Sequence, residues 1–561
     1  MTDSIDQSIR KAAAAMAKMG PKGATLPFDP FAIASATMEA AAGMAARPAD
    51  LFAIQRAAVG QWTDFWVRAV NPAADPAAKP KDRRFAAAAW QDDPYFRTMR
   101  DAYLLASDQL RGVAAGAEGS GGAMVRFLLD QYLNAASPTN HAMTNPEVIE
   151  RTRETGGANL VRGFANLLED LSSGRGIVSR RTDRNAFVKG ETIAATPGEV
   201  VFRNDLFELI QYAPATAEVA GEPLLYVPPL VNRFYMIDLQ PRSSLIKWLV
   251  DQGRTIFVIS WVNPDESHRD KDVEAYVLEG IVTAIGEVAA RTGARPDLFA
   301  FCLGGTLVAI ALAYLAAAGR ADEVNSATLI GSMIDFADMR DWSAFVHEGH
   351  LDALDKHLDG QGYIDSFELQ RLFAAMRAND LIWSSVVNHY LLDRPAPPSD
   401  LLYWFEDGAR IPAAFLKSYN RDILFENRLA NGAGFSIGGK PIDLTDIATP
   451  LLVVALKDDH VSAWEAVYDG ARLLGADFLL GGSGHNAGVI NPPAANKHGY
   501  WTSDETPDRA EEWLAGATKH DGSWWPHWTA WLAAHGSGSR VKARKIEGGI
   551  EAAPGSYAKA N

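Results

Sequence analysis

The spacing of apolar residues changes near residue 186 of this 561-residue chain. Before that point, apolar residues recur at helical spacing, and one amphipathic stretch closes with Trp62, Phe65, Trp66 and Val67. Residues 116–122 are rich in glycine and predict a loop. Residues 1–185 are therefore predicted to be a helical N-terminal domain. This domain carries no cluster of reactive side chains, which favours a packing or oligomerisation role.

After residue 186, short apolar runs alternate with helical stretches. The runs predicted to be buried strands are 224–227, 255–260, 298–301, 327–331 and 451–456. Nearly continuous apolar strands that alternate with helices indicate a parallel sheet covered on both faces. Between about 337 and 445 this rhythm stops in a long aromatic stretch. We predict an α/β domain over 186–561, with a cap inserted at about 337–445.

Composition excludes several classes of protein. Hydrophobic residues make up 48% and charged residues 22% of the chain, as in soluble globular proteins. The formal net charge of −16 argues against a general nucleic-acid binder, which needs a basic surface. The longest apolar stretch, 306–318, is shorter than the roughly 20 residues that span a bilayer. We therefore expect neither a nucleic-acid partner nor a membrane span.

The chain contains a single cysteine, Cys302. An intrachain disulfide and a multi-cysteine metal site are thereby excluded. This usage is typical of a reducing cytoplasm, and the acidic first residues lack the pattern of a secretory signal. The sequence predicts a cytoplasmic protein with no metal site and no cofactor.

Cys302 lies where a nucleophile would stand in an α/β-hydrolase. The predicted strand Leu298-Phe-Ala-Phe runs directly into Cys302-Leu-Gly-Gly and then a helix. In this nucleophile elbow, a sharp turn lifts the reactive side chain above the sheet. The helix N-terminus that follows favours a thiolate and a developing oxyanion. The alternative interpretation is a buried cysteine that acts as a small hydrophobic residue.

A thiol nucleophile needs a base, and the base needs a group that orients it. Asp459 follows the predicted strand 451–456, and His485 follows the apolar run that begins at Phe478. Nucleophile, acid and histidine in this order are typical of α/β-hydrolases. Asp458 is an alternative acid, and His460 is an alternative base.

An oxyanion hole in this fold combines two backbone N–H groups. The residue after the nucleophile, Leu303, supplies the first. Val231 or its neighbours, in the loop that follows the strand 224–227, could supply the second. The alternative is that Pro228-Pro229 simply ends that strand.

Five motifs, four of which contain residues named above, resemble those of class I polyhydroxyalkanoate synthases. They are Phe301-Cys-Leu-Gly-Gly-Thr, Pro228-Pro-Leu-Val-Asn-Arg-Phe-Tyr, Ile259-Ser-Trp-Val-Asn-Pro-Asp, Asp459-His-Val-Ser-Ala-Trp and Ser483-Gly-His-Asn-Ala-Gly-Val-Ile-Asn-Pro-Pro. The resemblance extends from about residue 60 to the C-terminus. It implies an α/β-hydrolase catalytic domain in which Cys302, Asp459 and His485 are catalytic.

The resemblance also implies an activity and its partners. The substrates would be (R)-3-hydroxyacyl-CoA thioesters with short side chains, such as 3-hydroxybutyryl-CoA, and the products polyester and free CoA. A homodimer attached to polyester granules is implied, with the N-terminal domain as the candidate region for both contacts. Arg410 is a candidate CoA-binding residue, Trp404 a candidate wall of the substrate tunnel, and His460 a further candidate substrate contact.

Three interpretations remain open at this point. The same three residues would serve a thioesterase or a polyester depolymerase, although such hydrolases generally use serine. A non-catalytic granule-coat protein could keep the fold, although the complete set of reactive residues argues against it. Within the synthase interpretation, Asp459 either orients His485 or activates the hydroxyl of the next unit. The second role is favoured because polymerisation needs a second proton abstraction.

Overall fold

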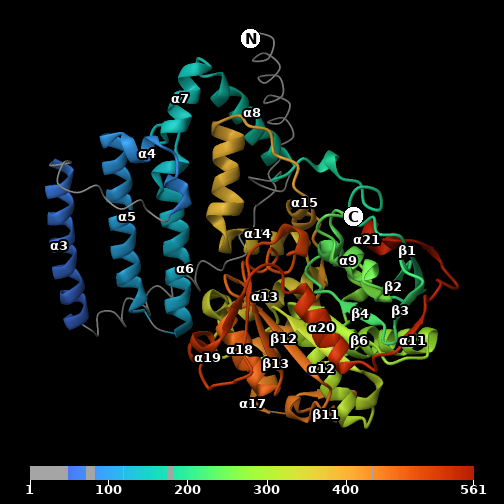
Figure 1. Ribbon diagram of the computed structural model, residues 1–561. Coiled ribbons are helices and arrows are strands. Elements are labelled where there is room, and N and C mark those ends of the chain that lie inside the picture. The colour runs from blue at the N-terminus through green and yellow to red at the C-terminus, as the bar shows by residue number, and fades with distance from the viewer. Residues whose placement is uncertain (1–47, 71–81, 118, 174–180, 433, 561) are drawn as a thin grey trace. The chain divides into compact units, whose positions relative to one another are not determined.

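The computed structural model describes residues 48–70, 82–117, 119–173, 181–432 and 434–560 (Figure 1). Residues 1–47 of the predicted helical domain lie outside this range. The chain forms two compact units. The first contains the described residues up to Arg184 together with Ser343–His350 and Gln370–Ser399. The second contains the remaining described residues, from Asn185 onward.

The first unit is helical (Figure 1). Its longer helices before Arg184 are α3 Pro48–Val70, α5 Pro94–Ala115, α6 Gly119–Ala136, α7 Pro146–Glu154 and α8 Ala158–Ser172. Local sequence defines where two of them begin. Asp93 accepts hydrogen bonds from the N–H groups of Tyr95 and Phe96, and Pro94 occupies the first turn of α5. Asn145 and Pro146 play the same parts for α7. These are favoured N-terminal caps, since they satisfy N–H groups that have no partner within the helix.

The glycine-rich segment 116–122 is only in part the loop that the sequence predicted, because α5 ends at Ala115 but α6 already begins at Gly119. A Cβ atom at Gly122 would lie 2.3 Å from the carbonyl oxygen of Ala117. This glycine permits a close backbone approach inside a helix. The prediction was wrong for residues 119–122, because glycine serves close packing as well as turns.

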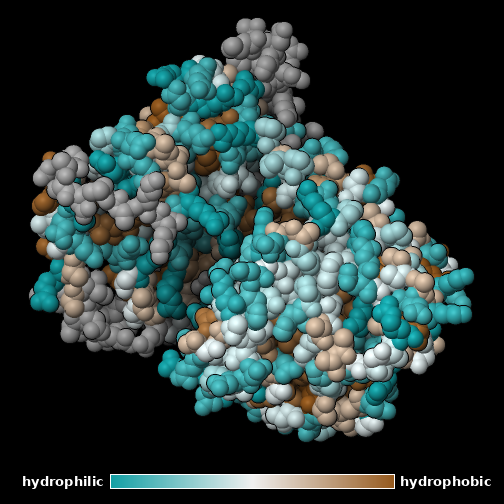
Figure 2. Space-filling view, viewed as in Figure 1, coloured by the Kyte–Doolittle hydropathy of each residue, from teal (hydrophilic) through white to brown (hydrophobic). Residues whose placement is uncertain are grey.

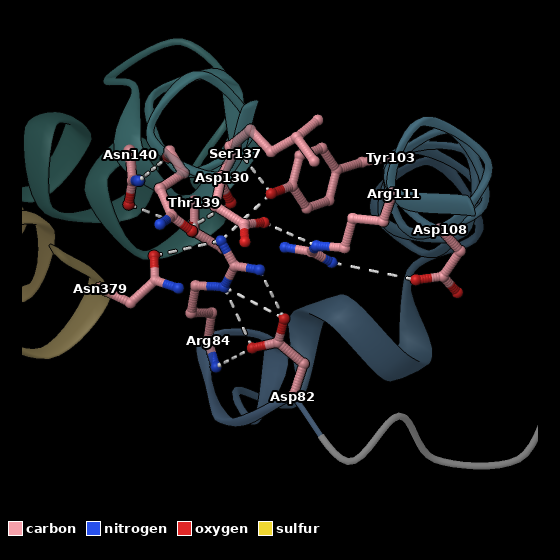
Figure 3. Close-up of polar contacts among 12 residues, drawn as sticks. Asp82, Arg84, Tyr103, Asp108, Arg111, Asp130, Ser137, Thr139, Asn140 and Asn379 are labelled. Carbon is pink, nitrogen blue, oxygen red and sulfur yellow. Dashed lines mark hydrogen bonds and ion pairs between the residues drawn. The ribbon is translucent and has the colours of Figure 1, made fainter. Parts of the chain in front are cut away.

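Polar contacts join separate parts of the first unit (Figure 3). The Arg84 guanidinium binds both carboxylate oxygens of Asp82 and also donates to Tyr103 Oη at 3.2 Å and Asn379 Oδ1 at 3.3 Å. Tyr103 lies on α5, and Asn379 begins the π-helical segment η9 Asn379–Trp383. Residues near 379 therefore pack with the N-terminal helices rather than with the sheet.

The segment predicted to form a cap divides between the two units. Ser343–His350 and Gln370–Ser399 belong to the helical unit, whereas Leu351–Leu369 and the residues from Asp400 onward belong to the second. Helices α15 Asp400–Glu406 and α16 Ala413–Ser418 are among the latter.

The second unit is built on one eleven-stranded sheet with the order β15-β14-β13-β12-β7-β6-β4-β5-β2-β1-β17. The six neighbours from β13 to β5 are parallel: β4 Leu224–Val227, β5 Ile256–Trp261, β6 Asp297–Phe301, β7 Ser326–Ile330, β12 Leu451–Leu456 and β13 Asp477–Gly481. All five apolar runs predicted as strands lie in this group. The predicted parallel sheet is confirmed, and its strands are mostly apolar and almost entirely buried because both faces are covered.

Antiparallel strands extend the sheet at both edges. They are β1 Gly198–Arg203, β2 Phe207–Tyr212 and β17 Glu551–Ala552 on one side, and β14 Tyr500–Thr502 and β15 Thr518–His520 on the other. The apolar pattern did not predict them. Most are short, and β1 and β15 carry exposed polar residues.

Helices cover both faces of the sheet (Figure 1). Helices α11 Thr283–Thr292, α12 Leu303–Ala317 and α18 Trp464–Leu473 pack into one hydrophobic core. Helices α9 Leu245–Asp251 and α20 Trp525–His535 pack into a second core. Both cores contain residues of the central strands, so the sheet holds the carboxyl end of β6 rigidly. Among the described helices, none is both long and apolar enough to cross a membrane.

Candidate active site

Cys302 occupies the turn between β6 and α12, as the elbow pattern predicted. Its φ of 53° and ψ of −128° are unusual for a residue with a side chain. The backbone is held there because Cys302 N donates to the Ile330 carbonyl of the neighbouring strand β7 at 2.9 Å. Strain of this kind persists where the surrounding structure imposes it, and it is concentrated at functional sites.

The two glycines after Leu303 make this turn possible. A Cβ atom at Gly304 would lie 2.5 Å from the carbonyl oxygen of Val227 at the end of β4. One at Gly305 would lie 2.0 Å from Ser332 Oγ. Side chains at either position would push α12 away from the sheet and displace Cys302.

Asp459 and His485 meet beside this turn. Each follows a strand, β12 and β13 respectively, and His485 Nδ1 lies 2.6 Å from Asp459 Oδ2. The Asp459 carboxylate has no exposed surface, and its Oδ1 accepts from the N–H groups of Val461 at 2.7 Å and Ser462 at 3.0 Å. Since Asp459 engages Nδ1, Nε2 is the ring nitrogen of His485 that is left to interact with Cys302.

The three side chains form one electrostatic unit. Burial by itself lowers the pKa of His485, but the negative charge of Asp459 and the interaction with Cys302 outweigh it and raise that pKa to about 10. The imidazolium form is thus favoured at neutral pH. His485 is thereby placed to act as the acid–base partner of the Cys302 thiol.

Aromatic rings surround this unit. The Phe301 ring centroid lies 4.6 Å from that of His485. Burial first, and then the charge of Cys302, raises the pKa values of Tyr226 and Tyr419, so both phenols stay neutral. No motif marked Tyr226 or Tyr419 as a neighbour of the site, because each lies far along the chain from Cys302.

The alternative acid, Asp458, and the alternative base, His460, are the two chain neighbours of Asp459. The side chains of Asp458 and His460 are exposed, whereas His485 is buried. Asp458 is fixed through its backbone, whose N–H donates to the Ser483 carbonyl at 3.0 Å. The structure therefore brings Cys302, His485 and Asp459 together.

The candidate oxyanion residues lie next to the elbow. Leu303 is the first residue of α12, so its N–H has no acceptor within that helix. Val231 lies in the loop between β4 and the 3₁₀ segment η4 Phe234–Asp238. Gly304 packs against the start of this loop at Pro228. Val231 is itself held through its carbonyl, which accepts from Ala409 N at 3.3 Å.

Comparison with known proteins identifies the family. Residues 81–249 match the model for the poly-beta-hydroxybutyrate polymerase (PhaC) N-terminus, and 223–492 match the alpha/beta hydrolase fold. A poly(3-hydroxyalkanoate) polymerase of Methylorubrum extorquens is 43% identical over 88% of this chain and 84% of its own length. The polymerase subunit PhaC of Cupriavidus necator is 38% identical over 93% of this chain and 90% of its own. The chain belongs to the poly(3-hydroxyalkanoate) polymerase family. It is an acyltransferase with an α/β-hydrolase fold, as its motifs indicated.

The substrate-contact residues predicted from the polymerase motifs lie in different settings. Arg410 is half-buried: its Nη1 donates to the Pro264 carbonyl at 3.2 Å, and its guanidinium lies 5.2 Å from the Tyr363 ring centroid. Trp404 is buried in the second core, where Nε1 donates to the Arg233 carbonyl at 2.7 Å. In the described part of the chain, no group of three His, Cys, Asp or Glu side chains is placed to hold a metal ion.

Sequence reasoning missed Arg233 and Lys189 in the polymerase. Both donate to backbone carbonyls near the C-terminus. Arg233 lies inside a recognised motif, yet nothing in that motif indicates which atoms its side chain reaches.

Proposed function

We propose that this polymerase joins (R)-3-hydroxyacyl-CoA units, such as 3-hydroxybutyryl-CoA and other short ones, into polyester and releases CoA. Growth would proceed through a thioester between the acyl group and Cys302. One observation carries the proposal: the only thiol of the chain stands at the turn between β6 and α12 and interacts with a histidine whose Nδ1 lies 2.6 Å from a buried carboxylate. We propose no cofactor; CoA enters with the substrate and leaves as a product.

Acylation begins when His485 holds the proton of Cys302. The thiolate attacks the thioester carbonyl, and the oxygen that becomes negative is stabilised by the N–H of Leu303 and a second N–H from the loop at Val231. The carbon–sulfur bond to CoA breaks, and CoA leaves with a proton from His485. One thioester replaces another, so the step is nearly balanced in free energy and leaves the acyl group activated.

Elongation then consumes the acyl-enzyme. The 3-hydroxyl of another unit attacks the acyl group on Cys302, gives up its proton to His485 and forms an ester, and the thiolate is released. Asp459 has Oδ1 bound to two N–H groups and Oδ2 bound to His485. A carboxylate with both oxygens engaged is better suited to orienting the imidazole than to receiving a proton from the hydroxyl. The geometry thus favours the orienting role over the elongation role preferred from the sequence.

Further contacts of the cycle remain proposals. Arg410 would bind a phosphate of CoA, while Trp404 and His460 are candidates for contacts with the acyl chain. The N-terminal unit is our candidate for homodimer formation and for attachment to polyester granules in the cytoplasm. The large apolar side chains that this unit exposes support that assignment.

One assay tests the function. Purified protein is incubated with 3-hydroxybutyryl-CoA and with longer homologues, and free CoA and insoluble polymer are both measured. We expect CoA and polymer together, with the four-carbon unit used better than the ten-carbon unit. CoA with soluble hydroxy acid would indicate a hydrolase, and release of neither would contradict the enzymatic proposal. Efficient use of the ten-carbon unit alone would overturn the class I assignment.

A further inference from the structure

The C-terminal segment is bound next to the loop that contains Val231, the candidate oxyanion residue. Strand β17 pairs with β1, and the short helix α21 Gly555–Lys559 follows it. Arg233 donates from Nη1 to the Tyr557 carbonyl at 2.8 Å and from Nη2 to the Ala560 carbonyl at 2.7 Å. Lys189 Nζ donates to the Ala558 carbonyl at 2.9 Å. Two cations thus bind carbonyls at the C-terminal end of α21, where helices lack internal partners and favour positive charge.

Arg233 is also part of the loop that contains Val231. Its side chain is buried, and among the described residues its Nε atom has no hydrogen-bond partner. The α21 carbonyls are thus the acceptors that keep this buried guanidinium in place. The backbone of Arg233 is held by Trp404, whose Nε1 donates to its carbonyl. Movement of α21 would leave a buried charge with few partners, which is costly unless the loop moves too.

Lys189 makes a second connection from α21 to the same loop. Its Nζ lies 2.9 Å from Asp407 Oδ2, which also accepts from Tyr235 Oη at 2.6 Å. Asp407 precedes Gly408, which forms a β-bridge with Asn232. The next residue, Ala409, donates to Val231, and Arg410 comes after it. A displacement of α21 would therefore affect the loop by two routes. One is Arg233, within the loop, and the other is Lys189 with the segment 407–409 that binds the loop.

We propose that Arg233 is a positioning residue for acyl transfer. Helix α21 binds the Arg233 side chain, and Arg233 in turn keeps the loop that contains Val231 in the geometry that stabilises the oxyanion. The inference deepens the proposed function and rests on it for its catalytic consequence. Coupling of α21 to the loop is a separate claim that can be measured without substrate. Because loss of an oxyanion donor costs about 10²–10³-fold in kcat, a partial displacement should still cost about tenfold or more.

Three variants test the proposal from both ends. Arg233→Met removes the guanidinium, and Arg233→Lys restores a positive charge and should recover part of the activity. Gly555→Ala leaves Arg233 intact but displaces α21, since Gly555 has a φ of 82° and its added Cβ would lie 2.2 Å from Glu208 Oε2. The matched control is Arg544→Met. Arg544 likewise donates to two carbonyls, of Ala220 and Gly221, on another side of the same unit.

The first measurement is amide hydrogen exchange of residues 230–236, which follow the two prolines of the loop. We expect faster exchange in Arg233→Met and Gly555→Ala, and no change in Arg544→Met. The second compares kcat for CoA release with the rate of Cys302 alkylation by iodoacetamide, which needs the thiolate but no oxyanion hole. We expect kcat to fall about tenfold or more while alkylation stays within about twofold.

Several outcomes would overturn the inference. Unchanged exchange in the two test variants would disprove the coupling, and wild-type kcat in either would disprove its catalytic role. Alkylation that falls in parallel with kcat would show a disturbed nucleophile instead. Additive effects in the double variant Arg233→Met/Gly555→Ala would mean that the two residues act separately. If the wild-type chain releases no CoA while the exchange result holds, the proposed function fails and the coupling stands.

Discussion

The two units of this polymerase differ in how many large apolar side chains they expose. In the α/β unit, the large exposed hydrophobic residues among those described are Val188, Phe425 and Ile550. The helical unit exposes many more: Val59, Trp66, Val67, Val70, Tyr95, Leu110, Tyr132, Met143, Ile149, Val161 and Phe164. Figure 2 shows such hydrophobic atoms at the surface of the N-terminal helices.

This contrast leads to separate predictions for catalysis and for association. In the α/β unit, Cys302 packs against both hydrophobic cores, so the candidate active site depends on internal packing. On α3 of the helical unit, Val59, Trp66 and Val70 are spaced seven and four residues apart and fall on one helix face. Exposed apolar stripes mark interaction surfaces more often than catalytic sites. The contrast predicts that changes in one unit abolish catalysis, whereas changes in the other alter association.

The largest effect is expected for Cys302→Ala. Because no other thiol exists in the chain, CoA release and polymer formation should both fall by about 10³-fold or more. Circular dichroism should be unchanged, since alanine fits the space of the thiol. Release of CoA at a substantial rate by this variant would rule out the covalent route.

Loss of the base should rank next. His485→Ala removes the partner of Cys302 and should slow the first acylation by about 10²–10⁴-fold. With an orienting role for Asp459, Asp459→Asn should slow acylation as well, because the imidazole loses both its tautomer and its charge partner. Rapid-quench labelling with radioactive 3-hydroxybutyryl-CoA measures this step. An Asp459→Asn enzyme that loads one acyl group at the normal rate and then stalls would restore the elongation role.

Titration sharpens the same point. Burial lowers the pKa of His485 and the charge of Asp459 raises it, with a result of about 10, so Asp459→Asn should bring that pKa down. A raised folded-state pKa stabilises the protein fully below the unfolded value of about 6.5 and progressively less up to pH 10. The stability advantage of the wild type over Asp459→Asn should therefore shrink as pH rises through 10. Histidine NMR titration and urea unfolding at several pH values check both statements.

Most of the sheet could be predicted from the sequence because its central strands are buried on both faces. Continuous apolar runs gave β4, β6 and β12 within a residue of their observed ends. The shortest edge strands, β14, β15 and β17, could not be predicted, since strands of two or three residues have no measurable period. Strands β1 and β2 have six residues each but mix polar and apolar side chains, so they do not form continuous apolar runs. The assignment of 370–399 to the helical unit depends on contacts such as Arg84 with Asn379, 295 residues apart along the chain.

The candidate site was predictable because its three residues occur along the chain in the order nucleophile, acid, histidine that is typical of α/β-hydrolases. Cys302, Asp459 and His485 each follow a predicted strand, so their meeting point follows from the parallel sheet. The contacts of Arg233 and Lys189 with α21 were not predictable, because the acceptors there are backbone carbonyls that carry no residue identity. These contacts became visible only with the position of α21.

A smaller effect is expected on the stripe of α3. The double variant Trp66→Lys/Val70→Lys places two charges on exposed apolar positions, so folding and Cys302 alkylation should be unchanged. If this stripe contacts polyester, co-sedimentation with polymer particles should fall several-fold. Met143→Lys is the matched control, since Met143 is 86% exposed and lies outside α3. Equal loss of binding in the control would assign the effect to net charge rather than to the stripe.

The smallest effect concerns the ion pair of Arg84 with Asp82 in the helical unit. Burial raises the pKa of Asp82, but its bonds to Arg84 lower it more, so the folded carboxylate has a depressed pKa. Its stabilisation is therefore present above the unfolded pKa and is lost as pH falls through the folded value. Asp82→Asn should lower the free energy of opening of α5 by about 1 kcal/mol at neutral pH, since the pair is bidentate and largely sheltered. Hydrogen exchange of the α5 amides measures this loss.

The control for that variant is Asp130→Asn. Asp130 accepts from Arg111 at 2.8 Å in a pair whose side chains are 43% and 47% exposed, and pairs of that kind contribute about 0–1 kcal/mol. The comparison should show a greater loss for Asp82, because Arg84 also reaches Tyr103 and Asn379 and so fastens segments from distant parts of the chain. The difference should disappear at a pH low enough to protonate Asp82 in the folded state. Equal losses at neutral pH would mean that Arg84 contributes no more than an ordinary surface pair to holding residues 370–399 against the N-terminal helices.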